Sequence, residues 1–102
     1  MPHGRAVWHS NGNAVKVIVN DEDHLRIEVD GPKADIPTLY KRLVQVTNHM
    51  ENKVQKYQRT KRLGYLTTDP AKLGTSFSCE MHMIIPQLAV DLTKLKVIAD
   101  KF

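Results

Sequence analysis

Apolar and polar residues alternate with a period of two along the first third of the chain. Residues 5–10 and 14–20 flank Asn11-Gly12-Asn13, and Asn-Gly between apolar runs is a strong hairpin signal because both residues tolerate positive φ. Residues 25–29 alternate apolar and charged side chains as a half-buried strand does, and Asp30-Gly31-Pro32 ends that run. The pattern predicts three antiparallel strands.

The period changes to three and four residues after Asp35, which indicates a long amphipathic helix. Asp35 can cap its N-terminus, and Pro37 is tolerated there because first-turn amides have no partner within the helix. The predicted apolar stripe consists of Ile36, Leu39, Tyr40, Leu43, Thr47, Met50, Val54 and Tyr57.

Two more strands and a second helix are predicted in the remainder. Residues 63–68 form an apolar run closed by Asp69-Pro70, and residues 77–85 alternate again until Pro86. The predicted second helix has an apolar face made of Leu88, Leu92, Leu95, Ile98 and Phe102. The order βββαββα predicts an α+β fold, with a mostly antiparallel sheet and two helices packed on one face.

Composition sets limits on the class of protein. The 102 residues fit a single domain, 1–102, and 41% hydrophobic with 25% charged residues is ordinary for a folded one. The single cysteine, Cys79, excludes an internal disulfide and favours a reducing compartment. No apolar stretch approaches the roughly 20 residues of a membrane span, and the first ten residues show no cleavable targeting signal. We therefore expect an intracellular protein without a membrane span.

Basic residues gather at the end of the long predicted helix, within a net charge of +4. Cations favour the C-terminal end of a helix dipole, so we expect a solvated helix end, with contact to RNA or an acidic protein as the alternative. No aromatic residues support nucleic-acid binding, which is not expected. The cluster is Lys53, Lys56, Arg59, Lys61 and Arg62, and the nearby or later Met50, Met81 and Met83 are interpreted as core residues.

The most unusual stretch joins the second and third predicted strands. Residues 20–26 contain three acids, a histidine and an arginine. One interpretation is an acidic turn whose side chains satisfy their own backbone. The other is a carboxylate site for a cation or a guanidinium, with Arg26 attracting an anion.

The same stretch carries a resemblance to a known family. Residues 17–27, VIVNDEDHLRI, resemble the VWVNEEDHLRI signature of the phosphagen kinases, the creatine and arginine kinase family. Pro2, Arg5 and Trp8-His9 resemble its WP-x-x-RGIWHN segment, and residues 39–44 resemble its VYKRLV helix. Residues 62–75 and 82–88 follow its LGYLT-x-CP-x-NLGT and VHIKLP-x-L segments in the same order. The resemblance implies a guanido kinase catalytic-domain-like fold.

The resemblance also implies a chemistry. The family transfers a phosphoryl group between Mg-ATP and a guanidino compound, and such catalysis depends on alignment and on several cations around the phosphates. By this resemblance Glu22 matches the carboxylate that holds the guanidinium, and Arg26 matches an arginine on the nucleotide phosphates. His82 matches a histidine beside the nucleotide.

Several positions depart from the family pattern. Asp69 stands where the family has a reactive cysteine, and Ser78 stands where it has an arginine. Ile18 replaces a tryptophan, Lys72 replaces an asparagine, and the chain ends at Phe102, before the remaining phosphate-binding arginines. We therefore expect a fragment without a working catalytic set, without a metal site or cofactor, and without appreciable Mg-ATP binding.

These expectations lead to a pseudoenzyme. The first hypothesis is a catalytically inactive structural or accessory subunit of a larger intracellular assembly, mitochondrial or cytoplasmic and ciliary, bound to other protein subunits through apolar surface that a lost domain once covered. The alternatives are a free-standing nucleotide-binding regulatory module that uses Glu22, Arg26 and His82, and a fragment that completes a guanidino kinase in trans.

Overall fold

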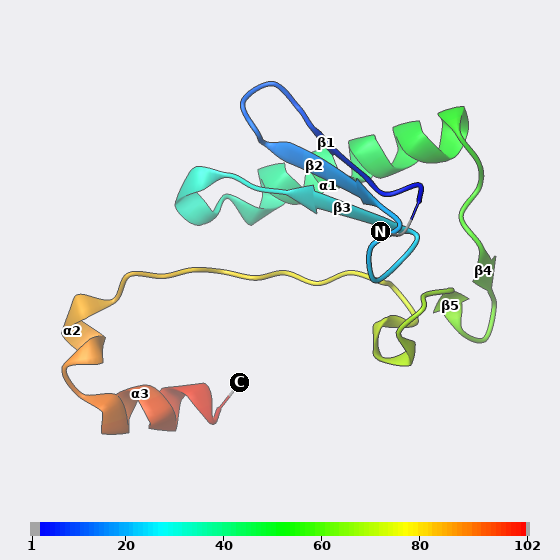
Figure 1. The fold of residues 1–102 in the computed structure, drawn as a ribbon. Coiled ribbons are helices and arrows are strands. Elements are labelled where there is room, and N and C mark those ends of the chain that lie inside the picture. The colour runs from blue at the N-terminus through cyan, green and yellow to red at the C-terminus, as the bar shows by residue number, and fades with distance from the viewer. Residues whose placement is uncertain (1–2, 102) are drawn as a thin grey trace.

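A three-stranded antiparallel sheet forms the first part of the molecule. The computed structural model describes residues 3–101, apart from the side chain of Ala34. The strands are β1 (Ala6–His9), β2 (Val15–Val19) and β3 (Leu25–Val29), in the order β1-β2-β3 (Figure 1). Gly12 and Asn13 have φ values of 81° and 55° in the first turn, which explains the Asn-Gly signal. The three predicted strands are confirmed.

The core lies along the central strand. Val15, Val17 and Ile18 are the buried hydrophobic residues of the described chain. Val17 pairs with Trp8 on one side and Ile27 on the other, so β2 is covered on both edges, as a central strand must be. Paired residues of neighbouring strands lie on the same side of a sheet, so these three residues share one face.

Helix α1 (Ile36–Lys53) packs against β3. The Asp35 carboxylate accepts a hydrogen bond from Thr38 N at 3.2 Å, which confirms the predicted cap. The helix ends before Val54, which is 74% exposed. Tyr57 therefore does not continue the apolar stripe along the helix. The chain folds back instead, and the Tyr57 hydroxyl donates to the Thr47 carbonyl at 3.0 Å.

The predicted strand 63–68 is mostly irregular. A small antiparallel pair joins β4 (Arg59–Thr60) to β5 (Gly64–Tyr65), and β4 was not predicted because its residues are polar. Gly64, at φ 71°, closes the turn and lies against Gly74, whose carbonyl accepts from Tyr65 N at 2.8 Å. A short 3₁₀ turn, η2 (Pro70–Lys72), follows.

The predicted strand 77–85 is wrong in this structure. The segment is extended, but no backbone hydrogen bond pairs residues 76–84 with any other part of the described chain. Figure 1 shows it as the long yellow stretch between β5 and α2, without a neighbouring strand. Met81 and Met83, interpreted as core residues, are 47% and 65% exposed. An alternating pattern needs a neighbouring strand and a covering layer, and the described residues supply neither here.

The predicted second helix is broken into α2 (Pro86–Ala89) and α3 (Leu92–Ala99). Asp91 caps α3 by accepting from Lys94 N at 3.1 Å, so the chain restarts rather than continues a helix. Within residues 3–101 α3 packs on α2 and not on the sheet, which corrects the prediction of two helices on one sheet face. Phe102 lies outside the described residues.

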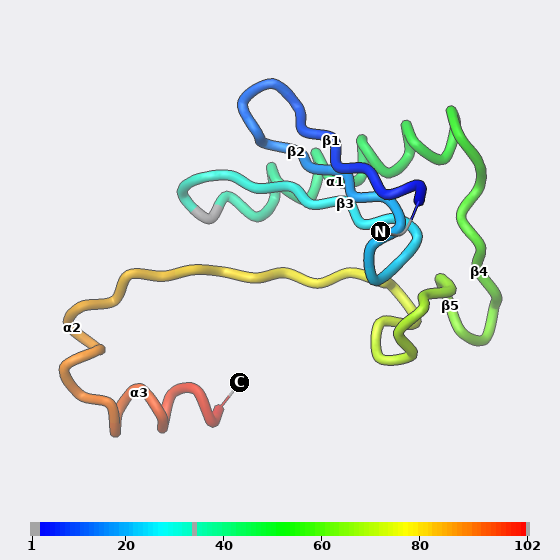
Figure 2. The backbone as a smooth tube through the Cα atoms, viewed as in Figure 1, coloured from blue at the N-terminus to red at the C-terminus, as the bar shows by residue number. Residues whose placement is uncertain are grey.

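The arrangement is open as a result. Figure 2 follows the backbone from the sheet and α1 through the extended segment to α3. The radius of gyration is 17.2 Å, against about 13 Å for a compact domain of this length. The α+β class with antiparallel strands is confirmed, while the second half of the molecule lacks a core of its own.

Candidate functional site

The acidic stretch forms a tight connection between β2 and β3. Asn20 has a φ of 55°, its N–H donates to the His24 carbonyl at 3.0 Å, and Asp21 N donates to the Asp23 carbonyl at 3.2 Å. The Arg5 guanidinium donates to the Asn20 carbonyl at 2.8 Å. These backbone bonds fix the turn, which leaves the carboxylates of Glu22 and Asp23 available to other partners.

Those carboxylates contact a distant lysine. Lys72 Nζ lies 3.0 Å from Glu22 Oε2 and 3.7 Å from Asp23 Oδ2. The other oxygen of Asp23, Oδ1, accepts from Thr68 N at 2.8 Å. The Asp23 side chain is 19% exposed and that of Glu22 is 73% exposed. The β2–β3 turn is thus joined to the segment around η2 by one ammonium and one backbone amide.

The ion pair affects the titration of the lysine. The hydrogen bond that Lys72 Nζ donates to Glu22 raises the pKa of Lys72, and partial desolvation opposes this change. The charges of Glu22, Asp23 and Asp69 add to the increase. Lys72 therefore remains an ammonium at neutral pH, and the arrangement is a carboxylate pair already supplied with a cation.

Arg26 has a different partner. It lies on β3, and its Nε is 2.8 Å from Glu28 Oε1, while Lys16 Nζ is 3.1 Å from Glu28 Oε2. Lys16 is opposite Glu28 in the strand register, and Arg26 is two residues from Glu28 on the same strand, so these charges share one face of the sheet. The Arg26 side chain is 54% exposed, which leaves part of the guanidinium open to solvent.

The other predicted site residues lie apart from this cluster. Asp69 accepts from Ala71 N at 2.9 Å and so caps η2. Ser78 and His82 lie exposed on the unpaired segment 77–85. Among the described residues no hydrogen bond or ion pair joins Glu22 to Arg26, Ser78 or His82. The structure therefore brings Glu22 to Lys72 and leaves the other matched positions separate.

Sequence reasoning missed three members of this arrangement. Lys72 was recognised as a replaced position but not as a partner of Glu22, and neither Asp23 nor Thr68 was singled out. The pairing joins residues 50 positions apart, so no local pattern could give it. The one signal in the sequence was charge: three acidic residues in one turn need a cation nearby, but the sequence does not say which lysine or arginine supplies it.

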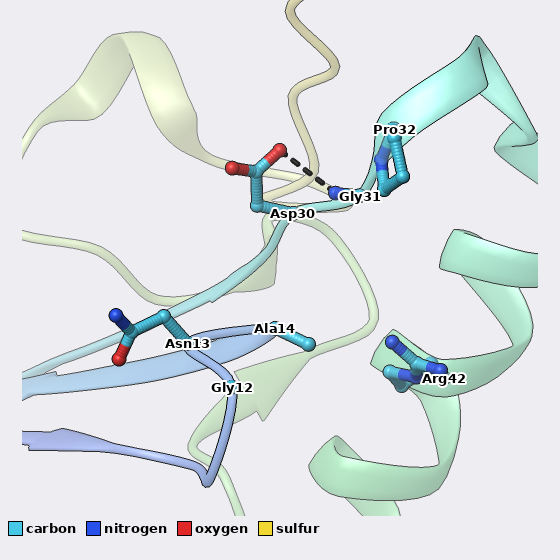
Figure 3. A pocket seen from close by; sticks show the side chains of 7 residues that line it. All are labelled: Gly12, Asn13, Ala14, Asp30, Gly31, Pro32 and Arg42. Atoms are coloured by element: carbon cyan, nitrogen blue, oxygen red, sulfur yellow. Dashed lines mark hydrogen bonds between the residues drawn. The ribbon is translucent and has the colours of Figure 1, made fainter.

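A surface depression lies elsewhere in the molecule. It has a volume of about 420 Å³ and is lined by Gly12, Asn13, Ala14, Asp30, Gly31, Pro32 and Arg42 (Figure 3). Ala14 precedes β2 and Asp30 follows β3, so the depression lies at the opposite end of this strand pair from Glu22. Asp30 Oδ1 accepts from Gly31 N at 2.8 Å, which makes this carboxylate part of the turn.

The described residues contain no group of three or more histidine, cysteine or acidic side chains placed to hold a metal ion. No described helix has the length and apolar character needed to cross a membrane.

The basic cluster is exposed along its whole length. Lys53 ends α1, whereas the other members follow it through the β4–β5 turn. Arg59 lies 5.7 Å from the centroid of the Tyr65 ring, which is a cation–π distance. The cluster therefore extends beyond the helix end, and its members are Lys53, Lys56, Arg59, Lys61 and Arg62.

Comparisons with known proteins agree with the geometry. The family model described as ATP:guanido phosphotransferase, C-terminal catalytic domain, matches residues 1–102. Arginine kinases of Schistocerca americana, Polybetes pythagoricus and Limulus polyphemus are 40%, 41% and 40% identical over 99% of this chain, which spans 28% of each relative.

A solved structure gives the same result for the fold. The duplicated taurocyamine kinase from Schistosoma mansoni, with bound transition state analog components, superimposes with a TM-score of 0.82 and 33% identity. The match covers 95% of this chain and 13% of that one. Sequence and fold lead to one conclusion: the chain belongs to the ATP:guanido phosphotransferase family and corresponds to a part of its C-terminal catalytic domain.

Proposed function

We propose that this chain is a catalytically silent member of the phosphagen kinase family that acts as an accessory subunit of a larger intracellular assembly. The unpaired segment 77–85 is the observation that carries the proposal. The backbone amides and carbonyls of residues 77–84 have no backbone partner in the described chain, and unpaired strand-like segments invite association with another chain.

The side chains of this segment favour a protein partner. Phe77, Met83 and Ile84 are 49%, 65% and 97% exposed, and most monomeric proteins cover such contiguous apolar residues. Phe77 packs edge-on against Tyr40 of α1, with ring centroids 5.6 Å apart. This contact holds one end of the segment next to the sheet layer and leaves the remainder accessible.

The partner is therefore an extended protein strand with alternating apolar side chains. Main-chain hydrogen bonds would satisfy the free amides, and apolar side chains would cover the methionines and isoleucines of residues 77–85. Nucleic acid and lipid headgroups offer neither the main-chain bonds nor the alternating apolar contacts. The covering strand belongs to another subunit in this proposal, and the same polypeptide is the alternative that the experiment distinguishes.

The site supports the absence of phosphoryl transfer. An arginine placed on the transferring phosphate is worth roughly a thousandfold or more in rate, and Arg26 is the matched arginine here, already paired with Glu28 at 2.8 Å. Asp69 and Ser78 supply neither a thiolate nor a guanidinium. We expect no phosphate transfer from Mg-ATP to arginine or taurocyamine, the compounds after which the relatives are named, by the chain alone.

Proline substitutions test the strand addition. Proline removes one amide donor, and adjacent amides point to opposite edges of a strand, so Met83→Pro and Ile84→Pro each block one edge. Leu92→Pro is the matched control, because residue 92 begins α3 and follows the extended Asp91, with a φ of −118°, where proline is tolerated. Each variant is expressed in cells of the protein's source and sized by gel filtration in high salt.

The expected outcome is a large complex for the wild type and for Leu92→Pro. At least one of the other two variants should move toward the 11.6 kDa of the free chain. If the wild-type chain itself migrates at that mass, the accessory role is overturned. Mass spectrometry of the complex separates a second subunit from a longer form of the same polypeptide, and the latter would also contradict the proposal.

Two other functions predict different results. A nucleotide-binding module should gain melting temperature with millimolar Mg-ATP and lose that gain with Arg26→Ala. A fragment that completes a kinase in trans should show activity only after mixing with a second chain, and Glu22→Gln should remove it. We expect neither result, and either one would replace the accessory role.

A further inference from the structure

We propose that Lys72 is an internal cation that occupies the carboxylates of the β2–β3 turn and excludes guanidino compounds from them. The inference rests on the proposed function, in which the chain transfers no phosphate, and on the resemblance by which Glu22 matches the family's guanidinium-binding carboxylate. It deepens that function by giving a physical reason why the site rejects its ligand.

The contacts of the ammonium are those that a cationic ligand would make. Lys72 Nζ is 3.0 Å from Glu22 Oε2 and 3.7 Å from Asp23 Oδ2, so two of the three carboxylates of the turn face the same charge. An ammonium is a compact charge that can bridge two carboxylates, whereas a guanidinium needs a planar pair of acceptor oxygens. The ammonium thus takes the charge without reproducing the fork geometry.

The lysine is presented by a fixed turn. Asp69 caps η2 through Ala71 N at 2.9 Å, and Lys72 N donates to the Asp69 carbonyl at 3.0 Å. Asp23 binds the same segment a second time through Thr68 N at 2.8 Å. Because the cation and the carboxylates are held in one molecule, a free ligand must compete with an effective concentration in the millimolar range or above.

An incidental surface ion pair would differ in two respects. An exposed pair normally involves two mobile side chains without further contacts and contributes little. Here the Asp23 side chain is 19% exposed and has a backbone hydrogen bond besides the ion pair.

Ligand titration of a lysine variant tests the inference. L-Arginine is the probe, added to the full ¹⁵N-labelled chain at constant ionic strength, and the amides of residues 21–24 and Thr68 report binding by NMR. Lys72→Asn restores the residue that the family has at this position. Lys94→Asn is the matched control, since Lys94 also forms an ion pair, 3.3 Å from Asp91 Oδ2, and the change in charge is identical.

We expect Lys72→Asn to bind arginine at least about tenfold more tightly than the wild type or Lys94→Asn, because the intramolecular competitor is gone. Adding Glu22→Gln to Lys72→Asn should abolish the gain. Equal titrations of Lys72→Asn and Lys94→Asn would overturn the inference, as would a gain that persists without the Glu22 carboxylate. Lys72→Met keeps the aliphatic stem and provides a second variant if the asparagine disturbs the fold.

The result is separable from that of the accessory role. Lys72 lies outside residues 77–85, so Lys72→Asn should leave the size of the complex unchanged. If the complex is absent but Lys72→Asn binds arginine, the accessory role fails and the inference stands. If the complex is present but arginine titrates all variants alike, the inference alone fails.

Discussion

Val17 on β2 and Ile84 in the segment 77–85 both have β-branched side chains, yet their exposures are 6% and 97%. Val17 has a strand on each side, with Trp8 and Ile27 opposite it. Ile84 has no backbone partner in the described chain. The two halves of the molecule thus differ in their neighbours rather than in their sequence pattern.

The difference comes from the distance over which contacts form. The strands of the first half are joined by short turns, so each strand brings its own partner and the entropy of loop closure is small. Residues 77–85 need a partner that lies far along the chain or in another chain. The second half therefore contains an extended segment without a backbone partner in the described chain. Three comparisons test this contrast, in order of expected effect.

The largest effect is expected from a charge placed in each half. Val17→Asp buries an unpaired carboxylate and should lower the free energy of unfolding by about 3 kcal/mol or more. Ile84→Asp should change it by less than about 0.5 kcal/mol, because the side chain is already in water. Urea unfolding followed by circular dichroism measures both variants. A comparable loss for Ile84→Asp would show that the second half has a core in solution.

The second comparison concerns the loss of stability on replacing two glycines with positive φ. Gly12, at φ 81°, has no atom within 4 Å of an added Cβ, whereas a Cβ on Gly64 would meet the Gly74 backbone. Gly12→Ala should cost about 1 kcal/mol from its backbone conformation alone. Gly64→Ala should cost about 2 kcal/mol or more, since overpacking is added. The NMR signals of β4 and β5 should shift only in the second variant, and their constancy would argue against the close approach.

The smallest effect concerns the junction of the two halves. Tyr57→Phe removes the 3.0 Å hydrogen bond to the Thr47 carbonyl and should cost about 1 kcal/mol. Burial, then Glu51 and Tyr65, raise the pKa of Tyr57 above 10.0. The folded state thus favours the neutral phenol, and its stabilisation is complete below pH 10 and is lost as the pH rises through the higher folded value. The wild type should lose more stability in that range than Tyr57→Phe does, as melting curves against pH would show.

The elements of the first half were predictable because their signals are local. Asn-Gly in the first turn, the alternation of residues 25–29 and the Asp35 cap each act over a few residues. The same reasoning failed for residues 77–85 and for the second helix, because alternation and helical periodicity identify an apolar face but not what covers it. In the described chain residues 77–84 have no neighbouring strand, and α2 and α3 pack on each other rather than on the sheet.

The candidate site shows the same division. The residues that resemble the family signature identified Glu22 and Arg26 as positions of interest, and their catalytic roles in this chain stay predictions. The partner of Arg26 is local, because Glu28 lies two residues away on the same strand, whereas the partner of Glu22 was not predictable, because Lys72 is 50 residues away. Only the folding of the η2 segment against the β2–β3 turn places the ammonium there.

The sequence by itself determined the family, the α+β class and the strands and caps whose hydrogen bonds close within a few residues. The tertiary structure decided which apolar faces are covered and which carboxylate meets which cation. The physical reason is that turns and caps depend on local backbone conformation, whereas burial and ion pairing depend on segments that approach one another only after the chain has folded.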